Sequence, residues 1–363
     1  MTGTPDQHHA FALKGHIQRG DIAPWWNQGR YRFVFDSIGG RYVVLSFYQS
    51  ARDAVGQAAL RALDDHRCFI EEQKAAFFCV SADPSDQSVS KLDRNFSALR
   101  FLWDFDGTVN RAYGIGAGRL WIVLDPMLRV LEVIPFRSDG SDRQQLFDLL
   151  DNLPPPSRFL GFEIQAPILI LSHVFEREFC RHLIDVFERH GGMESGFMQE
   201  MGAKTVENYD PQWKRRKDHI IADKALIEQI TARISRRVGA MMQSAFHFKV
   251  TRIERQLVAR YSAEDGGHFG AHRDDTVKAT EHRRFAVSIN LNDDFDGGEV
   301  SFPEFGSRQF KAPIGAAVIF STSLLHCVGK VTRGHRYAFL PFVHDEEAEK
   351  VRQANLQSLS QSA

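Results

Sequence analysis

Apolar residues in the first 150 positions form short continuous runs that alternate with helically spaced patterns. Residues 42–48 and 75–80 are almost entirely apolar over the length of a strand, which is typical of strands buried on both faces. Between them, residues 51–68 carry Ala and Leu at helical spacing. Residues 120–126 end in the turn signal Asp-Pro, and residues 130–134 follow as a hairpin partner. This order predicts an α/β sandwich around a mixed sheet.

The apolar pattern changes in the second half of the chain. An apolar run at 168–171 predicts a strand, and helical spacing predicts helices at 178–190 and at about 223–244. The second helix would bury Ile227, Ile230, Ile234, Val238 and Met241. Short apolar runs between Gly and Asp turns then predict strands at 256–261, 285–290, 298–302, 316–320 and 336–340. Many short strands behind helices favour an antiparallel jelly roll with a helical support layer.

The best internal boundary is the run of three prolines from Pro154 to Pro156. Proline has no amide hydrogen to donate, so this run favours an extended spacer. With 363 residues, the chain is long enough for a core on each side of it. The predicted parts are an N-terminal tail (1–19), a first domain (20–151), a proline-rich linker (152–163), a second domain (164–345) and a polar C-terminal tail (346–363), where a short helix frays.

Charge and cysteine usage limit the partners. Lys+Arg 45 against Asp+Glu 46 gives a net charge of −1, so no global attraction to nucleic acid or to an anionic membrane is expected. The local basic run is residues 213–217, which is more typical of a solvated helix start than of a binding site. No apolar run is long enough to span a bilayer. The four cysteines form no CxxC pair, which indicates a reducing compartment and a cytoplasmic protein.

Candidate metal ligands lie in the second half. On a strand, residues two apart project from the same face, so His272 and Asp274 can share one ion. His326 would complete a set of two histidines and one carboxylate, which is diagnostic of non-haem Fe(II) oxygenases. In a chain with 15 histidines, roughly one His-x-Asp is expected by chance, and a lone His326 would more often be a core residue. Arg336, ten residues further on, supports the functional interpretation because an arginine can hold a dicarboxylate by two hydrogen bonds.

These residues, in this order and spacing, resemble the 2-oxoglutarate/Fe(II) dioxygenases of the prolyl 4-hydroxylase type. The surrounding motifs Asn290-Leu291-Asn292-Asp293, Gly297-Gly298-Glu299 and Phe302-Pro303 extend the resemblance over about residues 164–345. It implies a double-stranded β-helix, Fe(II) held by His272, Asp274 and His326, and 2-oxoglutarate held by Arg336 with Tyr261. O2 is the implied co-substrate, and ascorbate is a possible reductant. No catalytic residue is expected beyond the iron centre, and the carboxylate of Asp274 favours hydroxylation over halogenation.

The loop from Ser262 to Ala271 contains three glycines, and such a pliable segment suits a lid over a substrate. His268 lies in this loop, four residues before the first predicted ligand, and is equally consistent with a core or surface histidine. Arg284 and Asn290 are the other candidates for substrate or lid contacts.

The first half resembles the peroxiredoxin branch of the thioredoxin-like fold over roughly residues 20–150. The motifs, in order, are Gly20-Asp21-Ile22-Ala23-Pro24, Ser46-Phe47-Tyr48, Val80-Ser81-Ala82-Asp83, Trp103-Asp104-Phe105-Asp106-Gly107, Tyr113-Gly114-Ile115 and Ile122-Val123-Leu124-Asp125-Pro126. A peroxiredoxin needs a thiolate in the first turn of the helix after the first strand. Residues 49–55 contain no cysteine there, and Cys68 and Cys79 are better explained as small apolar residues. Arg119 resembles a remnant of the arginine beside the family's active cysteine, so this domain is expected to dock or dimerise.

Three functions therefore remain open. The first is hydroxylation of a prolyl, other peptidyl or amino-acid substrate, and the second is the same iron chemistry on a small metabolite or a modified base. The third is a catalytically silent binding or scaffold protein. Residues 214–217 would favour an acidic or phosphorylated target if they face the iron, and an open groove would favour a peptide over a metabolite.

Overall fold

The computed structural model describes residues 16–28, 33–71, 74–88, 99–201 and 204–361, and most of the predicted tail 1–19 lies outside them. The chain divides into two compact units. Unit 1 comprises Met1–Gln165 with Pro303–Ser307, and unit 2 comprises Ala166–Phe302 with Arg308–Ala363. Within the described residues, no helix is both long and apolar enough to cross a membrane.

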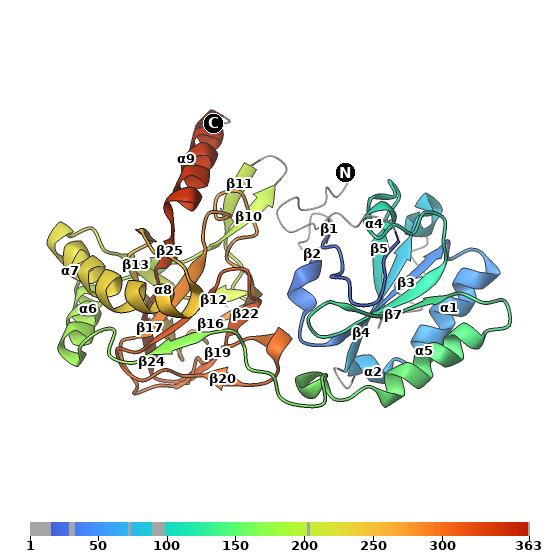
Figure 1. The fold of residues 1–363 in the computed structure, drawn as a ribbon, viewed down its shortest axis with the longest axis horizontal. Coiled ribbons are helices and arrows are strands. Elements are labelled where there is room, and N and C mark those ends of the chain that lie inside the picture. Colours follow the sequence, from blue (N-terminus) through green and yellow to red (C-terminus); the bar gives the residue numbers. More distant parts are fainter. Residues whose placement is uncertain (1–15, 29–32, 72–73, 89–98, 202–203, 362–363) are drawn as a thin grey trace. The chain divides into compact units, whose positions relative to one another are not determined.

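Unit 1 is built on one five-stranded mixed sheet of order β5-β4-β3-β6-β7 (Figure 1). Its strands are β3 (Tyr42–Gln49), β4 (Ala75–Ser81), β5 (Arg100–Trp103), β6 (Leu120–Leu124) and β7 (Val130–Pro135). β3, β4 and β5 run parallel, while β6 and β7 form the predicted antiparallel hairpin. The shorter elements are β1 (Asn27–Gln28), β2 (Phe33–Val34), η1 (Phe35–Ile38), α2 (Cys68–Glu71), η2 (Pro84–Ser88) and α4 (Thr108–Ala112).

The central strand β3 is buried on both faces, as its apolar run predicts. Tyr42 and Val44 pack with helices α1 (Ala54–Asp65) and α5 (Ser141–Asn152), while Val43 and Phe47 belong to a second core on the other face. Helix α1 begins where the Asp53 carboxylate accepts a hydrogen bond from the Gly56 amide at 2.7 Å. The predicted thioredoxin-like sandwich is therefore present.

The proline run is extended at Pro155, with φ −53° and ψ 142°, but it does not stay extended to its end. Pro156 begins the 3-10 turn η3 (Pro156–Arg158), because a fixed φ suits the first residue of a helical turn. The carbonyl of Pro154 accepts a hydrogen bond from the Tyr42 hydroxyl at 2.8 Å, so the segment is attached to unit 1.

Unit 2 contains a nine-stranded sheet and a five-stranded sheet, an arrangement consistent with the predicted jelly roll. The large sheet contains β8 (Leu169–Leu171), β9 (Met193–Glu194), β13 (Lys217–Ile220), β14 (Arg252–Glu254), β15 (Leu257–Ser262), β17 (Phe285–Asn290), β21 (Ala317–Ser321), β24 (His335–Phe339) and β25 (Phe342–His344). The small sheet contains β12 (Lys214–Arg215), β16 (His268–His272), β19 (Val300–Ser301), β20 (Gln309–Phe310) and β22 (His326–Val328). The remaining elements are β10 (Phe197–Met201), β11 (Lys204–Asn208), β18 (Asp296–Gly297), β23 (Val331–Arg333) and the 3-10 turn η5 (Pro303–Phe305), which is grouped with unit 1.

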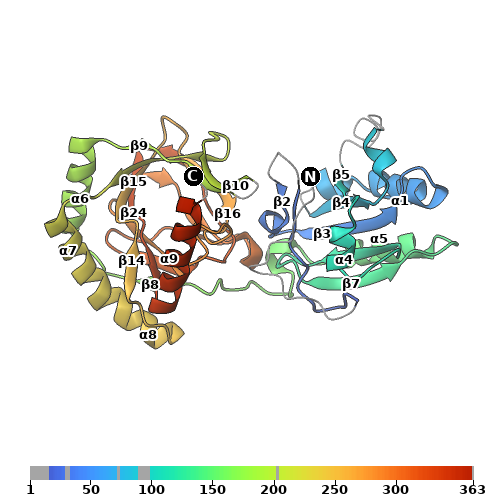
Figure 2. The same ribbon diagram turned by 90° about the horizontal axis from the view of Figure 1, so that it is seen from above.

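Helices α6 (Arg177–His190), α7 (Lys224–Ile234) and α8 (Ala240–Phe246) form the support layer against the large sheet (Figures 1 and 2). The predicted helix 223–244 is interrupted by a π turn, η4 (Ser235–Gly239). A π turn takes one more residue than an α turn, so Met242 rather than Met241 is buried. The predicted polar tail is the 16-residue helix α9 (Glu346–Gln361) rather than a short fraying helix.

Leu183 on α6 lies at the centre of this helix–sheet core with no exposed surface. We expect Leu183→Ala to lower the free energy of unfolding by about 2–5 kcal/mol, because a cavity would replace the side chain. Urea denaturation measures this loss. The control Met193→Ala, at a side chain that is 81% exposed, should change it by less than about 0.5 kcal/mol. Equal effects of the two changes would contradict this description of the core.

Candidate metal centre

Strand alternation gives the large sheet of unit 2 one apolar face and one polar face. The apolar side chains packed against the helices include Val258, Val287, Ile289, Tyr337 and Phe339. Successive side chains of a strand point to opposite faces. The other face therefore carries Tyr261, Ser288, Asn290 and Arg336.

The two candidate histidines come together through the pairing of the small sheet. His272 ends β16, His326 begins β22, and the two residues are direct cross-strand partners. Their ring centroids are 4.2 Å apart. Asp274 lies with them: its carboxylate oxygens are 3.6 Å from His272 Nε2 and 3.3 Å from His326 Nε2.

Asp274 does not reach this position in the way that the spacing suggested. Strand β16 ends at His272, so the prediction that both residues alternate along one strand is wrong. The chain bends after His272, and the Asp274 amide donates a hydrogen bond to the Thr322 carbonyl at 2.9 Å. That contact holds the carboxylate beside the two imidazoles.

The hydrogen bonds of the histidines determine which nitrogen is free. His272 Nδ1 lies 2.7 Å from the Gly270 carbonyl, and His326 Nδ1 lies 3.0 Å from the Leu324 carbonyl. A carbonyl can only accept, so Nδ1 carries the proton in both rings and Nε2 keeps its lone pair. Two lone pairs and a carboxylate thus face one another. This arrangement fits a divalent cation, and metal-bound histidines usually have such a partner on the other nitrogen.

Electrostatics favour a neutral His272 and an ionised Asp274. Burial, with the neighbouring His326, lowers the pKa of His272 to about 4, so its ring is neutral at neutral pH. Burial alone would raise the pKa of Asp274, but the adjacent imidazoles hold it well below its ordinary value. A carboxylate with neutral imidazoles is the donor set that a divalent metal requires.

Arg336 is buried on the polar face with part of its guanidinium available. Its Nε donates to Asn290 Oδ1 at 3.0 Å and its Nη2 to Ser288 Oγ at 2.9 Å. Nη1 is buried and has no hydrogen-bond partner among the described residues. A buried donor without an acceptor is costly, so this atom fits the carboxylate of a ligand. Asn290, predicted as a substrate or lid residue, holds Arg336 through this hydrogen bond.

Tyr261 lies beside Arg336 as its cross-strand partner, with the guanidinium 5.4 Å from the ring centroid. Its hydroxyl accepts a hydrogen bond from Arg216 Nη1 at 3.3 Å. Arg216 also pairs with Asp218, with an Nη2–Oδ2 distance of 2.6 Å. Tyr261 therefore contacts a second arginine, Arg216, besides the predicted Arg336.

The basic run is a strand region and not the start of a solvated helix, so that prediction is wrong. Lys214 and Arg216 are each 7% exposed, whereas Arg215 is exposed. Lys214 lies on β12 of the small sheet, and Arg216 lies in the break before β13 of the large sheet. Lys214 donates to Ser195 Oγ at 2.8 Å, and burial lowers its pKa although the carboxylate of Asp274 acts in the other direction.

Two further candidates lie outside this group of residues. Both ring nitrogens of His268 face backbone carbonyls, of Gly266 at 2.8 Å and of Gln212 at 3.0 Å. His268 lines a cavity of about 690 Å³ whose walls include none of the three candidate ligands. Arg284 donates to the Glu281 carbonyl at 2.8 Å. Neither residue is brought to the candidate centre by a contact that the structure shows.

The predicted ten-residue loop is shorter in the structure. β15 extends to Ser262 and β16 begins at His268, so only five residues form the turn. The Gly267 amide donates to the Ser262 carbonyl at 2.7 Å, which closes the turn tightly. A Cβ on Gly270 would lie 2.9 Å from the Trp213 ring, so this glycine permits close packing rather than motion.

Ser288 was missed as a site residue. It is two residues before Asn290 on a predicted strand, so alternation could have indicated its face. For Lys214 and Arg216 the sequence left open whether they face the site. Only the fold shows that both side chains are buried.

Comparisons with known proteins match both halves of the chain. Residues 257–344 match the family model of the 2OG-Fe(II) oxygenase superfamily, and residues 19–133 match that of the AhpC/TSA family. A PKHD-type hydroxylase of Synechococcus sp. (strain JA-2-3B'a(2-13)) is 34% identical over 94 residues, which is 24% of this chain and 41% of the relative. One of Maricaulis maris (strain MCS10) is 26% identical over 180 residues, which is 48% of this chain and 77% of the relative. The chain thus spans about two fifths of the length of the first curated relatives.

Solved structures also match. A Pseudomonas putida prolyl-4-hydroxylase has a TM-score of 0.38 and 14% identity, covering 50% of this chain and 94% of its own. A Trichoplax adhaerens prolyl hydroxylase in complex with a hypoxia inducible factor peptide has a TM-score of 0.38 and 15% identity, covering 58% of this chain and 95% of its own.

We expect His272→Ala and Asp274→Ala each to remove the visible band that forms when Fe(II) chelates 2-oxoglutarate without oxygen. Each change deletes one of the facing donor atoms, and loss of an outer partner alone costs about 10–100-fold in metal affinity. The control His268→Ala, on the same strand, should keep the band. A normal band in folded Asp274→Ala would contradict the assignment.

Proposed function

Because the chain carries a domain of the 2OG-Fe(II) oxygenase superfamily and a domain of the AhpC/TSA family, we propose that it is an Fe(II)- and 2-oxoglutarate-dependent dioxygenase that hydroxylates an unactivated C–H bond. One observation supports this most directly. In unit 2, two imidazole lone pairs and a carboxylate face one another. In the same unit, Arg336 Nη1 is buried and has no partner among the residues that the structure describes. The relatives named PKHD-type hydroxylases are consistent with the proposed reaction.

His272, Asp274 and His326 would hold Fe(II), and Arg336 would hold the distal carboxylate of 2-oxoglutarate. Iron so bound supplies the oxidation of 2-oxoglutarate to succinate and CO2, coupled to transfer of one oxygen atom of O2 to the substrate. The residues of the chain itself would bind these groups and orient the side chains that hold them. Ser288 and Asn290 fix the guanidinium of Arg336, and the Gly270 and Leu324 carbonyls fix the two imidazoles.

The proposed substrate is a prolyl, other peptidyl or amino-acid group that carries an anionic substituent. Lys214 and Arg216 support the anion, because both side chains are buried in unit 2 and the Asp274 carboxylate acts on the Lys214 amine. Asp218 already pairs with two arginines, Arg216 and Arg255, so it leaves positive charge uncompensated. A substrate carboxylate near Lys214 would favour the protonated amine, whose pKa burial lowers, and buried charges favour such pairing.

Succinate formation and product mass together test the proposed reaction. Proline-containing peptides with acidic residues, the same peptides with amides, and free amino acids would be supplied with Fe(II), 2-oxoglutarate and ascorbate. We expect substrate-dependent succinate and a product heavier by one oxygen with the acidic peptides. Turnover on a small metabolite, with none on the peptides, would change the proposed substrate from a peptide to a metabolite. A normal iron–2-oxoglutarate band without turnover on any substrate would favour a binding protein.

We also propose that unit 1 docks a partner or a second copy and does not reduce peroxides. The first turn of α1 contains no cysteine, and Asp53 at its start pairs with Arg119, with an Nη2–Oδ2 distance of 2.5 Å. A carboxylate thus occupies the helix terminus where a thiolate would be stabilised. Burial raises the pKa of the Cys79 thiol, which makes it a poor nucleophile. All four cysteines are free, and we place the protein in the cytoplasm.

Arg336→Ala is expected to weaken 2-oxoglutarate binding about 100-fold or more, because it removes one partner of a buried ion pair. Titration of the visible band at saturating Fe(II) measures the affinity. Arg333→Ala is the matched control, because Arg333 is 64% exposed at the side chain and pairs with Asp296. An equal loss of Fe(II) affinity in Arg336→Ala would contradict the division of roles.

The full chain is expected to consume hydrogen peroxide no faster with a thiol reductant than without it, since the accessible turn of α1 has no thiolate. Cys68→Ser and Cys79→Ser should leave the rate unchanged. Reductant-dependent turnover that disappears in Cys68→Ser would show that unit 1 is a peroxidase. Deletion of residues 1–152 with no change in oligomeric state, stability or turnover would exclude the docking and dimer roles.

A further inference from the structure

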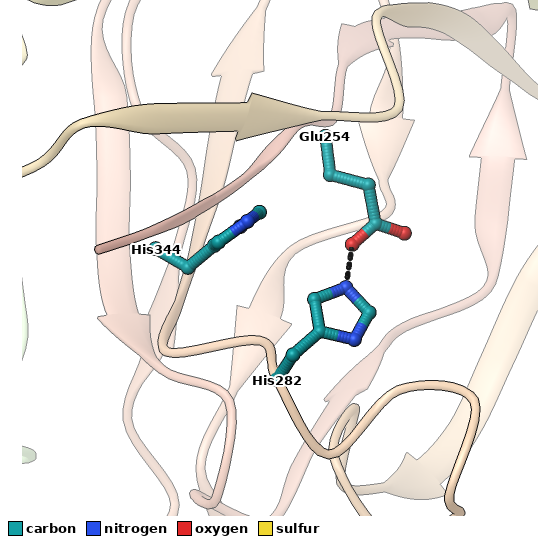
Figure 3. A group of neighbouring side chains, drawn as sticks. All are labelled: Glu254, His282 and His344. Atoms are coloured by element: carbon teal, nitrogen blue, oxygen red, sulfur yellow. Dashed lines mark hydrogen bonds and ion pairs between the residues drawn. The ribbon is translucent and has the colours of Figure 1, made fainter. Parts of the chain in front are cut away.

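A second group of metal-binding side chains lies in unit 2, separate from the candidate iron ligands. Glu254 ends β14, His282 precedes β17, and His344 ends β25. One ligand atom of each residue lies within 4.8 Å of the other two. Figure 3 shows the three side chains converging from different segments of the chain, with His282 hydrogen-bonded to Glu254.

The two histidines are deeply buried, and each has a nitrogen available. His282 and His344 are each 2% exposed, and Nδ1 of both has no hydrogen-bond partner in the part of the chain that the structure describes. His344 Nε2 lies 2.9 Å from Glu349 Oε2. A carboxylate only accepts, so Nε2 carries the proton and Nδ1 of His344 keeps a buried lone pair. Such an atom usually has a partner.

Glu254 supplies the negative charge. His282 Nε2 lies 2.5 Å from Glu254 Oε2, and Arg283 Nη2 donates to Glu254 Oε1 at 2.9 Å. Burial acts to raise the pKa of Glu254, but His282 and Arg283 hold it well below its ordinary value. Burial also lowers the pKa of His344. The carboxylate is therefore ionised and the His344 imidazole neutral, as metal binding requires.

We propose that Glu254, His282 and His344 form a second site for a divalent transition-metal ion, with Zn²⁺ as its natural type. The ion takes the place of the proton between His282 Nε2 and Glu254, and that proton passes to Nδ1 of the same ring. The His344 lone pair completes a set of two imidazoles and one carboxylate, which suits Zn²⁺. Glu349 holds the other nitrogen of His344, an arrangement that recurs around metal-bound histidines. Because both histidines are buried, the ion is structural: it joins β14, the segment before β17, and the junction of β25 with α9.

One side chain links this site to the candidate iron centre. Arg283 donates to Glu254 and also, through Nη1, to the Asp274 carbonyl at 3.4 Å. Loss of either metal could therefore affect the other site. The experiment must therefore measure metal binding at each of the two sites separately.

The double variant His272→Ala, Asp274→Ala removes two of the three candidate iron ligands and leaves the second group intact. We expect this folded protein to bind one equivalent of Zn²⁺ in equilibrium dialysis. Zinc at about 100 times its Kd should raise Tm by roughly 5 °C. Adding His344→Gln should abolish zinc binding, and adding Glu349→Gln should weaken it about 10–100-fold.

The control adds His182→Gln, at an exposed histidine of α6, to the double variant. It should leave zinc binding and the zinc-dependent rise in Tm unchanged. The proposal is overturned if the folded double variant binds no zinc at micromolar concentrations, or if it still binds one equivalent with His344→Gln. It is also overturned if His344→Gln lowers Tm equally with and without zinc, because the group is then only a hydrogen-bond network.

If the double variant does not fold, the zinc count is made on the wild-type protein. Two equivalents, reduced to one by His344→Gln with the iron–2-oxoglutarate band retained, support the second site. One equivalent in the wild type that His344→Gln does not remove overturns it. The band reports the first centre alone, so failure of the proposed dioxygenase and failure of the second site give different results.

Discussion

Two imidazole lone pairs and one carboxylate face each other inside unit 2, and this arrangement of acceptors fits a cation between them. The backbone imposes it. Both Nδ1 protons are directed at carbonyls of their own strands or turns, of Gly270 and Leu324, so neither ring can turn to offer a proton to Asp274 without losing a hydrogen bond. The pairing of β16 with β22 sets His272 opposite His326. A register slip of one residue would turn these side chains to the opposite face, so the register of the small sheet is a condition for metal binding.

The large sheet serves stability and chemistry with the same alternation. One face of β17 and β24 packs Ile289 and Phe339 against the helices, while the other presents Asn290 and Arg336. Apolar burial on the first face holds the strands that fix the guanidinium on the second. A buried arginine is therefore positioned by strands rather than by a loop, and two of its nitrogens already have partners. That leaves one direction, along Nη1, in which it can recognise a carboxylate.

Unit 1 keeps its sheet and the start of its first long helix without a cysteine in the first turn of that helix. Its sheet and the capped start of α1 are complete, but the negative charge at that helix terminus comes from Asp53, paired with Arg119. The Asp53 carboxylate has the negative charge that a thiolate would have at this helix terminus, but it is not a thiolate nucleophile. Unit 2 has the opposite character, with reactive groups collected in its interior and held by backbone hydrogen bonds.

The sequence by itself determined the elements whose signal is local. Continuous apolar runs predicted β3, β4 and β17, and helical spacing predicted α1 and α6, because burial on one or both faces imposes those periods. The spacing of His272, Asp274, His326 and Arg336 indicated the candidate centre. Only the tertiary structure decided that Asp274 reaches the histidines by a bend held at Thr322, and that Lys214 and Arg216 are buried. Glu254, His282 and His344 are brought together by strand pairing and loop packing between segments far apart in sequence, and no spacing along a single chain carries that information.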